Sequence, residues 1–226
     1  MQQGPPAPAA PPVLTVSAAA GEPHRRERKK RQTRDALVHA ALDLFIAKGY
    51  EHTAVREITD AVDVSERTFF RYFANKEDLA LSFAKDHTDA LLRELRARPP
   101  GELPLAALRN ALHAATTRLT EEAGDPAGDS VYRSIMKLIE GTPSLLAAHL
   151  RYMHEQDEEI ARVLAEREGV DPMADLRPRC VTAVYSGLFI TANREWHYGG
   201  GTVEAMLATF DACAAQVAEA LAGHWS

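Results

Sequence analysis

The sequence is poor in the residues that several classes of protein require. Cysteine is scarce, since Cys180 and Cys213 are the only two among 226 residues, and their spacing matches no metal or redox motif. We expect both to be small buried residues, with a redox-sensing role as the lesser alternative. No apolar run reaches the about eighteen residues that cross a bilayer. The proline-rich start also lacks the basic residues of a signal peptide. These absences predict a cytoplasmic protein with reduced thiols and no membrane partner.

Glycine is also sparse, with 13 residues, and runs of β-branched or aromatic residues that are typical of strands are rare. Alanine, leucine, glutamate and arginine dominate, and all four are good helix formers. The hydrophobic share of 46% is enough for a core, so we predict an all-α fold. The sequence lacks a nucleophile elbow, a glycine-rich phosphate loop and a zinc-binding histidine pair. We therefore expect no enzyme, no cofactor and no metal site.

The charge is unevenly distributed. The net charge of −6 argues weakly against nucleic acid as a partner. Residues 24–76, however, carry twelve Lys and Arg against eight Asp and Glu, and the stretch HRRERKKRQTR (24–34) has seven basic residues and one acidic residue. This asymmetry is typical of an N-terminal part that binds a polyanion, joined to an acidic body. A solvated basic linker would give the same pattern.

Composition divides the chain into four parts. Residues 1–23 hold six of the 13 prolines and are predicted to be a disordered Pro/Ala-rich tail. Residues 24–32 form a basic arm, helical only if something holds it. Residues 33–78 are predicted to be a DNA-binding domain, from the helix pattern described next, and residues 79–226 a larger helical body.

The predicted DNA-binding domain contains short helices with recognisable ends. A first helix runs from Thr33 to Lys48, with apolar residues at helical spacing, and Gly49 suits the left-handed position that follows its end. Thr53 is suited to cap a second helix, and Ser65 a third that runs to about Phe73. Two short helices joined by a tight turn form the helix-turn-helix layout, whose second helix enters the DNA major groove. The helices expected beyond it are 76–97 (capped by Asn75), 104–120, 130–140, 143–168, 178–198 and 203–222, with a loop at 124–129.

The stretch SERTFFRYFANKEDL (65–79) has the chemistry for such a role. Phe69 and Phe73 lie four apart on one helix face and are assigned to the core. The opposite side carries residues that suit base edges and phosphates, because arginine forks match guanine or phosphate and aromatic edges pack on thymine methyls. An amphipathic helix with solvated arginines is the alternative, but the capped turn before the stretch favours DNA binding.

The pattern T-x-V-x-x-I-x-x-x-x-x-V-S-x-x-T-F-F-R-Y-F-x-N-K-E-D-L, from Thr53 to Leu79, resembles the DNA-binding domain of the TetR family of transcriptional regulators. The resemblance covers about 33–80. It implies a homodimer in which the helical body, residues 79–226, is the effector-binding and dimerisation domain. It implies that Thr53, Tyr72 and Lys76 contact phosphates. It also implies positions at the DNA groove for Arg56, Arg67, Thr68, Phe70 and Arg71. The full set of predicted DNA-binding residues is Thr53, Arg56, Ser65, Arg67, Thr68, Phe70, Arg71, Tyr72 and Lys76, with Arg28, Lys29, Lys30 and Arg31 in the arm. The arm resembles the minor-groove or backbone-tracking extensions of some members.

Two positions depart from the family pattern. The turn has Asp63 where glycine is usual, and aspartate tolerates a left-handed backbone better than most residues. The third helix carries Phe70-Arg71-Tyr72 where a tyrosine, a variable residue and a histidine are frequent. Base preference can therefore not be transferred from another member.

The resemblance also implies an effector pocket and a dimer interface in the body. Aromatic residues and methionines suit a mostly apolar effector of unknown identity, although each is also an ordinary core residue. The candidate lining residues are Phe83, His87, Leu112, Tyr132, Met136, Ile139, Tyr152, Met153, Tyr185, Phe189 and Trp196. Small residues in 177–221 permit close pairing with a second copy, or they complete the monomer's own core.

The resulting hypothesis is a ligand-responsive repressor that binds a near-palindromic double-stranded DNA operator as a dimer and leaves it when an effector binds. Two alternatives remain open from the sequence. One is an activator or global DNA-binding regulator with the same DNA-binding domain. The other is a helical ligand-sequestering protein whose DNA-binding domain has lost its function.

Overall fold

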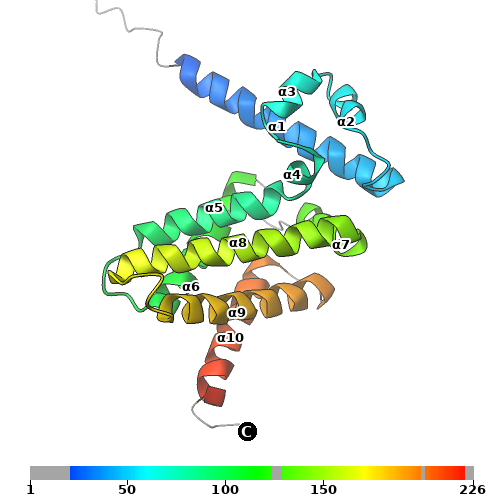
Figure 1. Cartoon of the computed structure of the whole chain (residues 1–226). Helices are drawn as coiled ribbons and strands as arrows, with labels where there is room; N and C mark the ends of the chain where they lie inside the picture. The colour runs from blue at the N-terminus through cyan, green and yellow to red at the C-terminus, as the bar shows by residue number, and fades with distance from the viewer. Residues whose placement is uncertain (1–20, 124–128, 200–201, 222–226) are drawn as a thin grey trace, which may run out of the picture.

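The computed structural model describes residues 21–123, 129–199 and 202–221, and all the regular secondary structure in these ranges is helical. The predicted DNA-binding domain and the predicted body lie at different heights in Figure 1. In chain order the helices are α1 (Gly21–Lys48), α2 (Val55–Ala61), α3 (Glu66–Phe70), α4 (Lys76–Ala80), α5 (Ser82–Ala97), α6 (Pro104–Ala123), α7 (Asp129–Gly141), α8 (Pro143–Glu168), α9 (Arg177–Gly199) and α10 (Val203–Leu221).

The body helices follow their sequence signals closely. Helix α8 begins at Pro143, where proline suits the first helical position, and ends before Gly169, whose φ of 66° is left-handed. Helices α9 and α10 begin and end within one residue of the predicted bounds. Most of the loop predicted at 124–129 lies outside the described residues.

Helix α1 is longer than the sequence pattern predicts. It begins at Gly21 rather than near Thr33 and continues without a break through the basic arm to Lys48. Pro23 lies in the first turn, where its missing N–H costs nothing. The Thr33 hydroxyl donates to the Lys29 carbonyl at 2.9 Å, within the same helix.

The predicted helix over 76–97 is divided in two at Leu81, and this prediction is corrected. Leu79, Ala80, Leu81 and Ser82 are all buried. A continuous surface helix buries one stripe and cannot bury four consecutive side chains on one packing face. The change of direction at Leu81, where φ is −92° and ψ is 1°, lets both α4 and α5 bury their own faces.

The buried hydrophobic residues form two clusters that do not follow the predicted domain boundary. The first cluster, which we call the reader core, contains Leu37, Phe45, Ile58 and Phe69 of the predicted DNA-binding domain. It also contains residues of α7 and of the start of α8, namely Ile135, Ile139, Leu145 and Ala148. The body core is built from α5, α6, the second half of α8, α9 and α10, with Leu112, Leu164, Tyr185 and Phe210 among its members. Helix α7 therefore packs with the DNA-binding domain.

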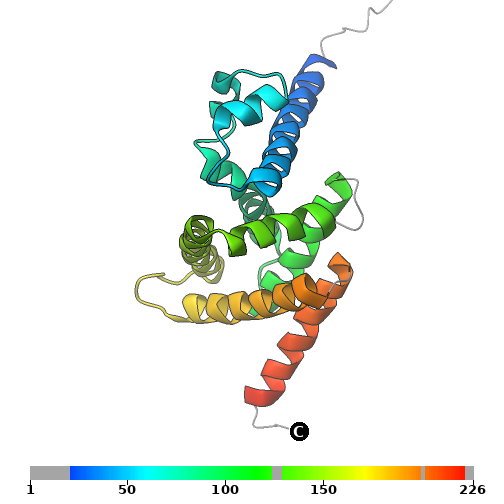
Figure 2. The same ribbon diagram turned by 90° about the vertical axis from the view of Figure 1, so that its right-hand side faces the viewer.

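The arrangement in space separates two ends of the molecule. The N-terminal end of α1 and the α2–α3 pair lie at one end, and α10 lies at the other, in both Figure 1 and Figure 2. Helix α5 packs along α6, and α8 packs along α9, which in turn contacts α10. The surface predicted to bind DNA is thus far from the surface predicted to form a dimer.

Candidate nucleic-acid interface

The turn between α2 and α3 has the geometry that the sequence predicts. Asp63 has a φ of 52°, and it is the only non-glycine residue with a positive φ in the described part of the chain. The Val64 N–H donates to the Thr59 carbonyl at 3.0 Å and closes the turn. Aspartate is among the few residues that adopt this conformation at modest cost. The prediction that the turn survives without glycine is confirmed.

Ser65 then starts α3 as an N-cap. Its hydroxyl oxygen accepts from the Thr68 N–H at 3.2 Å and lies 3.0 Å from the Thr68 hydroxyl. The predicted cap is therefore confirmed. Because the two hydroxyls share a hydrogen bond, Ser65 and Thr68 form one small polar unit at the exposed start of the helix.

The side chains of α3 divide between core and solvent as the spacing predicts. Phe69 is fully buried, and Phe73, just beyond the helix, is 3% exposed. On the opposite side Phe70 is 54% exposed and meets Phe69 edge-on, with ring centroids 5.3 Å apart. Arg67 and Arg71 are exposed. An exposed phenylalanine between two arginines presents apolar and cationic contacts side by side.

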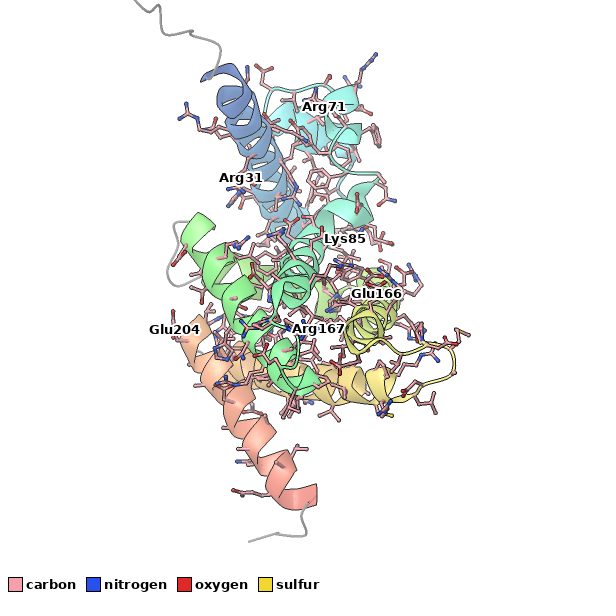
Figure 3. All side chains as sticks on the ribbon, turned by 90° about the vertical axis from the view of Figure 1, so that its left-hand side faces the viewer. Arg31, Arg71, Lys85, Glu166, Arg167 and Glu204 are labelled. Carbon is pink, nitrogen blue, oxygen red and sulfur yellow. The ribbon has the colours of Figure 1, made fainter. Side chains whose placement is uncertain are left out.

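Arg71 is not free to rotate in solvent. Its guanidinium lies 5.0 Å from the centre of the Tyr72 ring and donates to the Tyr72 hydroxyl at 3.2 Å. Figure 3 shows Arg71 on the side of the DNA-binding domain that faces away from the body. Stacking on an aromatic ring holds an arginine fork in place and lowers the entropy that a new contact would cost.

The helix ends early but its hydrogen bonds continue. Helix α3 ends at Phe70 instead of about Phe73. The Tyr72 and Phe73 N–H groups still donate to the Phe69 carbonyl, at 2.8 and 3.0 Å. Such differences at a tightening last turn are usual. Asn75 caps α4 as predicted, since its side chain accepts from the Asp78 N–H at 2.8 Å.

Thr53 is not placed as a phosphate ligand by its side chain. It is 3% exposed, and its hydroxyl donates to the Gly49 carbonyl at 2.9 Å. The N-cap of α2 is Ala54, whose N–H donates to the Glu57 carboxylate at 2.8 Å. The prediction that Thr53 caps α2 is wrong, because its hydroxyl is used to close the α1–α2 loop.

Lys76 is turned inward as well. Its ammonium donates to the Tyr50 carbonyl at 2.6 Å and to the Thr53 carbonyl at 3.0 Å, and it lies 4.1 Å from the centre of the Tyr50 ring. Burial lowers the pKa of Lys76, although Glu51 opposes this shift. Two of its three donors are therefore used to hold the α1–α2 loop, which departs from the predicted phosphate contact.

The remaining predicted DNA-binding residues lie in solvent. Arg56 is exposed and has Asp60 at 3.8 Å, one helical turn on. Such a pair contributes little by itself and is easily exchanged. In the arm, Arg28, Lys29, Lys30 and Arg31 are all exposed.

An ion pair joins the DNA-binding domain to the body. The Arg34 guanidinium of α1 is 2.8 Å from the Asp86 carboxylate of α5, and it also lies 5.4 Å from the centre of the Phe73 ring. Burial raises the pKa of Asp86, while Arg34 acts against the shift. The contact therefore ties the end of the α3 segment to the first helix of the body.

The predicted effector residues fall into two groups. His87, Leu112, Tyr185 and Phe189 come together where α5, α6 and α9 meet: Phe189 stacks on His87 at 5.6 Å and on Tyr185 at 6.2 Å between ring centres, and Leu112 belongs to the same core. Trp196 is also in the body core, whereas Phe83, Met136 and Ile139 pack in the reader core. Tyr152 and Met153 are half-buried on α8, and the side chain of Tyr132 lies outside the described residues.

Burial lowers the pKa of two histidines, His87 and His149. The His87 imidazole lies 3.3 Å from the Thr116 hydroxyl, and burial lowers its pKa to about 4. Burial also lowers the pKa of His149, and its Nδ1 has no hydrogen-bond partner among the described atoms. Both imidazoles are neutral near pH 7 and can serve as polar handles inside apolar surroundings.

Two hollows on the described part of the chain are lined by other residues than these. A surface hollow of about 300 Å³ is lined by side chains of α8, the loop after it and the start of α9 (Glu155, Glu158, Glu159, Ala161, Arg162, Pro172, Met173, Pro178 and Arg179). A void of about 10 Å³ lies among α1, α4 and α7. Sequence reasoning missed the larger hollow, because its lining is brought together by tertiary contacts between polar helix faces.

The cysteines, possible metal ligands and possible membrane spans can be checked in the described residues. Cys180 is exposed, so its predicted burial is wrong, while Cys213 is half-buried against the body core. Among the described residues no three His, Cys, Asp or Glu side chains are grouped so that they could hold a metal ion. Within the same residues, none of the helices combines the length and apolarity needed to cross a membrane.

The fold and this surface define a helix-turn-helix protein with a helical body. Comparison with known proteins makes the class more specific. Residues 37–83 match the family model described as "Bacterial regulatory proteins, tetR family", and residues 102–222 match the one described as "MftR C-terminal domain". The chain belongs to the TetR family of transcriptional regulators.

Two relatives and one solved structure illustrate the similarity. The HTH-type transcriptional regulator TcmR of Streptomyces glaucescens is 40% identical over 204 residues, which is 90% of both chains. MftR of Mycobacterium tuberculosis, named for the regulation of mycofactocin biosynthesis, is 29% identical over 84% of this chain and 94% of its own. A solved regulator from Pseudomonas aeruginosa PAO1 shares the fold, with a TM-score of 0.51, 18% identity, and 91% and 96% of the two chains covered.

Proposed function

We propose that this chain is a ligand-responsive repressor that binds a near-palindromic operator as a homodimer and is released by a mostly apolar small molecule. Because its partner is chromosomal DNA, we place it in the cytoplasm. The observation that carries the proposal is the surface of α3. Arg67, Phe70 and Arg71 are presented to solvent by a helix that Ser65 caps and Phe69 anchors.

The residues on this surface suit different parts of DNA. Arg67 lies in the first turns of α3, which face base edges in the helix-turn-helix docking geometry. Its fork can bind the O6 and N7 atoms of guanine. Arg71, held by Tyr72, lies at the end of the helix and suits a backbone phosphate. Phe70 can pack on a thymine methyl between them.

A second copy is needed to read two half-sites. Several small residues are exposed on α9 and α10, among them Ala183, Gly187, Ala208, Ala212 and Ala215. Val184 and Ile190 are 38% and 47% exposed on α9. Two helices with small and apolar exposed side chains can pack closely against their own copies, and this supports a dimer through α9 and α10. Ala192, also predicted for this face, is buried in the monomer's own core.

The effector is proposed to bind where the two cores meet. Phe83 packs in the reader core, whereas His87, one turn along α5, packs with Phe189 of the body core. Tyr152 of α8 reaches the same region, since its hydroxyl lies 3.4 Å from the Ala84 carbonyl. The surroundings are mostly apolar with neutral His87 and Tyr152 as polar handles, which favours an apolar ligand with a few hydrogen-bonding groups.

Release from DNA then follows as a population shift. An effector that binds better when the two cores are apart changes the position of the DNA-binding domain, because α7 moves with the reader core. The effect is limited by the difference in effector affinity between the two states. The Arg34–Asp86 pair is one of the polar contacts that such a movement would strain.

The experiment is an anisotropy titration of the protein against DNA from the region upstream of its own gene, with scrambled DNA of equal length, at two salt concentrations. Preference for the native fragment that survives the higher salt supports a specific regulator. Arg67→Ala should then weaken binding to that fragment by about 1–3 kcal/mol and relax the preference at one position. Equal loss on both DNAs would refute base reading by Arg67, and indiscriminate binding would favour a global DNA-binding regulator.

A further inference from the structure

The N-terminal part of α1 projects beyond the DNA-binding domain as a helix. Residues 28–32 are all exposed, and Leu37 is the next residue after them that is buried. Arg34 anchors this helix to the body through its ion pair with Asp86. From Gly21 to Gln32 the helix has twelve residues, so about 18 Å of helix lies ahead of this anchor at 1.5 Å per residue.

This projecting helix points to the same end of the molecule as α3. In Figure 1 and in Figure 2, turned by 90°, the start of α1 lies level with the α2–α3 pair and away from the body. A duplex that receives α3 in its major groove therefore also lies within reach of the start of α1. The side chains described there include Arg28, Lys29 and Lys30, each with a positive charge in solvent.

The helical form decides which part of DNA the arm can contact. An α-helix with its side chains is about 10–12 Å wide, whereas the minor groove is about 6 Å wide. The arm therefore cannot enter the minor groove without unwinding. The phosphate backbone remains accessible, and it is the natural partner of lysine and arginine side chains on a helix.

We propose that residues 28–30 form part of a helical clamp on the phosphate backbone that flanks the operator and that this clamp does not read bases in the minor groove. The inference rests on the proposed function, because it requires that α3 docks on DNA. It assigns the arm a sequence-independent contribution to affinity, separate from the discrimination by α3.

The test compares two triple variants in salt-dependent titrations on the upstream fragment that the wild type binds best. The arm variant is Arg28→Gln, Lys29→Gln and Lys30→Gln, because glutamine keeps the helix propensity. The control is Arg93→Gln, Lys137→Gln and Arg177→Gln, which removes three exposed charges from the body. The arm variant should lower the slope of log affinity against log salt by about 2–3, while its ratio of affinities for native and scrambled DNA stays at the wild-type value.

Two further measurements separate the outcomes. Trimming the duplex to the operator core should remove the difference between the arm variant and the wild type. Replacing flanking A·T pairs by G·C pairs places an amino group in the minor groove, and it should leave wild-type affinity unchanged. An unchanged salt slope in the arm variant, or a loss of affinity on the G·C flanks, would overturn the clamp. Absence of any preference by the wild type would instead refute the proposed function.

Discussion

Replacing His87 by glutamine should remove a pH dependence of stability that is built into the body. The imidazole lies between the Phe189 ring, 5.6 Å away between centres, and the Thr116 hydroxyl at 3.3 Å. Burial lowers its pKa from 6.5 to about 4. Glutamine does not titrate and can still bond to Thr116, so the variant isolates the contribution of the proton.

The sign and size follow from proton linkage. Between pH 4 and 6.5 the unfolded chain binds a proton at His87 and the folded chain does not. The free energy of unfolding therefore falls as the pH falls through this window, and the full stability is present above it. One pKa unit corresponds to about 1.4 kcal/mol, so the shift from 6.5 to about 4 corresponds to at most about 3.5 kcal/mol. Because the side chain is only half-buried, we expect His87 to change the free energy of unfolding by about 2–3 kcal/mol between neutral pH and pH 4.

The assay is urea denaturation followed by circular dichroism at several pH values from neutral to acid. Carboxylates also titrate in this range, so the quantity to compare is the difference between wild type and His87→Gln at each pH. That difference should shrink by about 2–3 kcal/mol as the pH falls. His52→Gln, which makes the same substitution at an exposed histidine, is the control. Parallel pH profiles for the wild type and His87→Gln would refute the reasoning.

Three further predictions concern the DNA-binding domain. Asp63→Gly should stabilise the protein by about 1 kcal/mol, because φ is positive there, whereas Asp63→Ala should destabilise it. Thermal unfolding of both variants measures this, and a lower stability of Asp63→Gly would contradict backbone strain at this position. Ser65→Ala should lower the free energy of unfolding in urea by about 1 kcal/mol, and Ser65→Gly by only a few tenths, since glycine is a tolerable N-cap. Equal losses of stability in the two variants would contradict a capping role for Ser65. Lys76→Met should destabilise the domain by about 1–3 kcal/mol, because the Tyr50 and Thr53 carbonyls lose their donor. Its salt slope on DNA should equal that of the wild type, and a slope lower by about one would restore a phosphate role.

Much of the fold was predictable because local chemistry marks the ends of helices. Pro143 and Gly169 mark the start and end of α8, Ser65 and Asn75 cap α3 and α4, and apolar residues repeat at helical spacing. The division of α3 between buried Phe69 and exposed Phe70 also followed from spacing alone. These features depend on residues within a few positions of one another, so the sequence contains them directly.

Other features had no local signal. The break at Leu81 has neither glycine nor proline, and it exists because four consecutive residues are buried by different neighbours. Thr53 and Lys76 look like solvent-facing donors in the sequence. The Thr53 hydroxyl bonds to the Gly49 carbonyl within the fold of its own loop. Lys76 bonds to the Tyr50 and Thr53 carbonyls, which only the packing of α4 against the end of α1 brings within reach.

By itself the sequence determined an all-α chain with a helix-turn-helix domain, the side of α3 that faces solvent, and the membership of the TetR family that the comparisons then showed. Only the tertiary structure decided that α7 belongs to the reader core, that Arg34 pairs with Asp86, and that the basic arm is a projecting helix. Helix spacing and capping act over three or four residues and are therefore readable along the chain. Core membership and ion pairs across helices depend on how distant segments pack, which no short stretch of sequence contains.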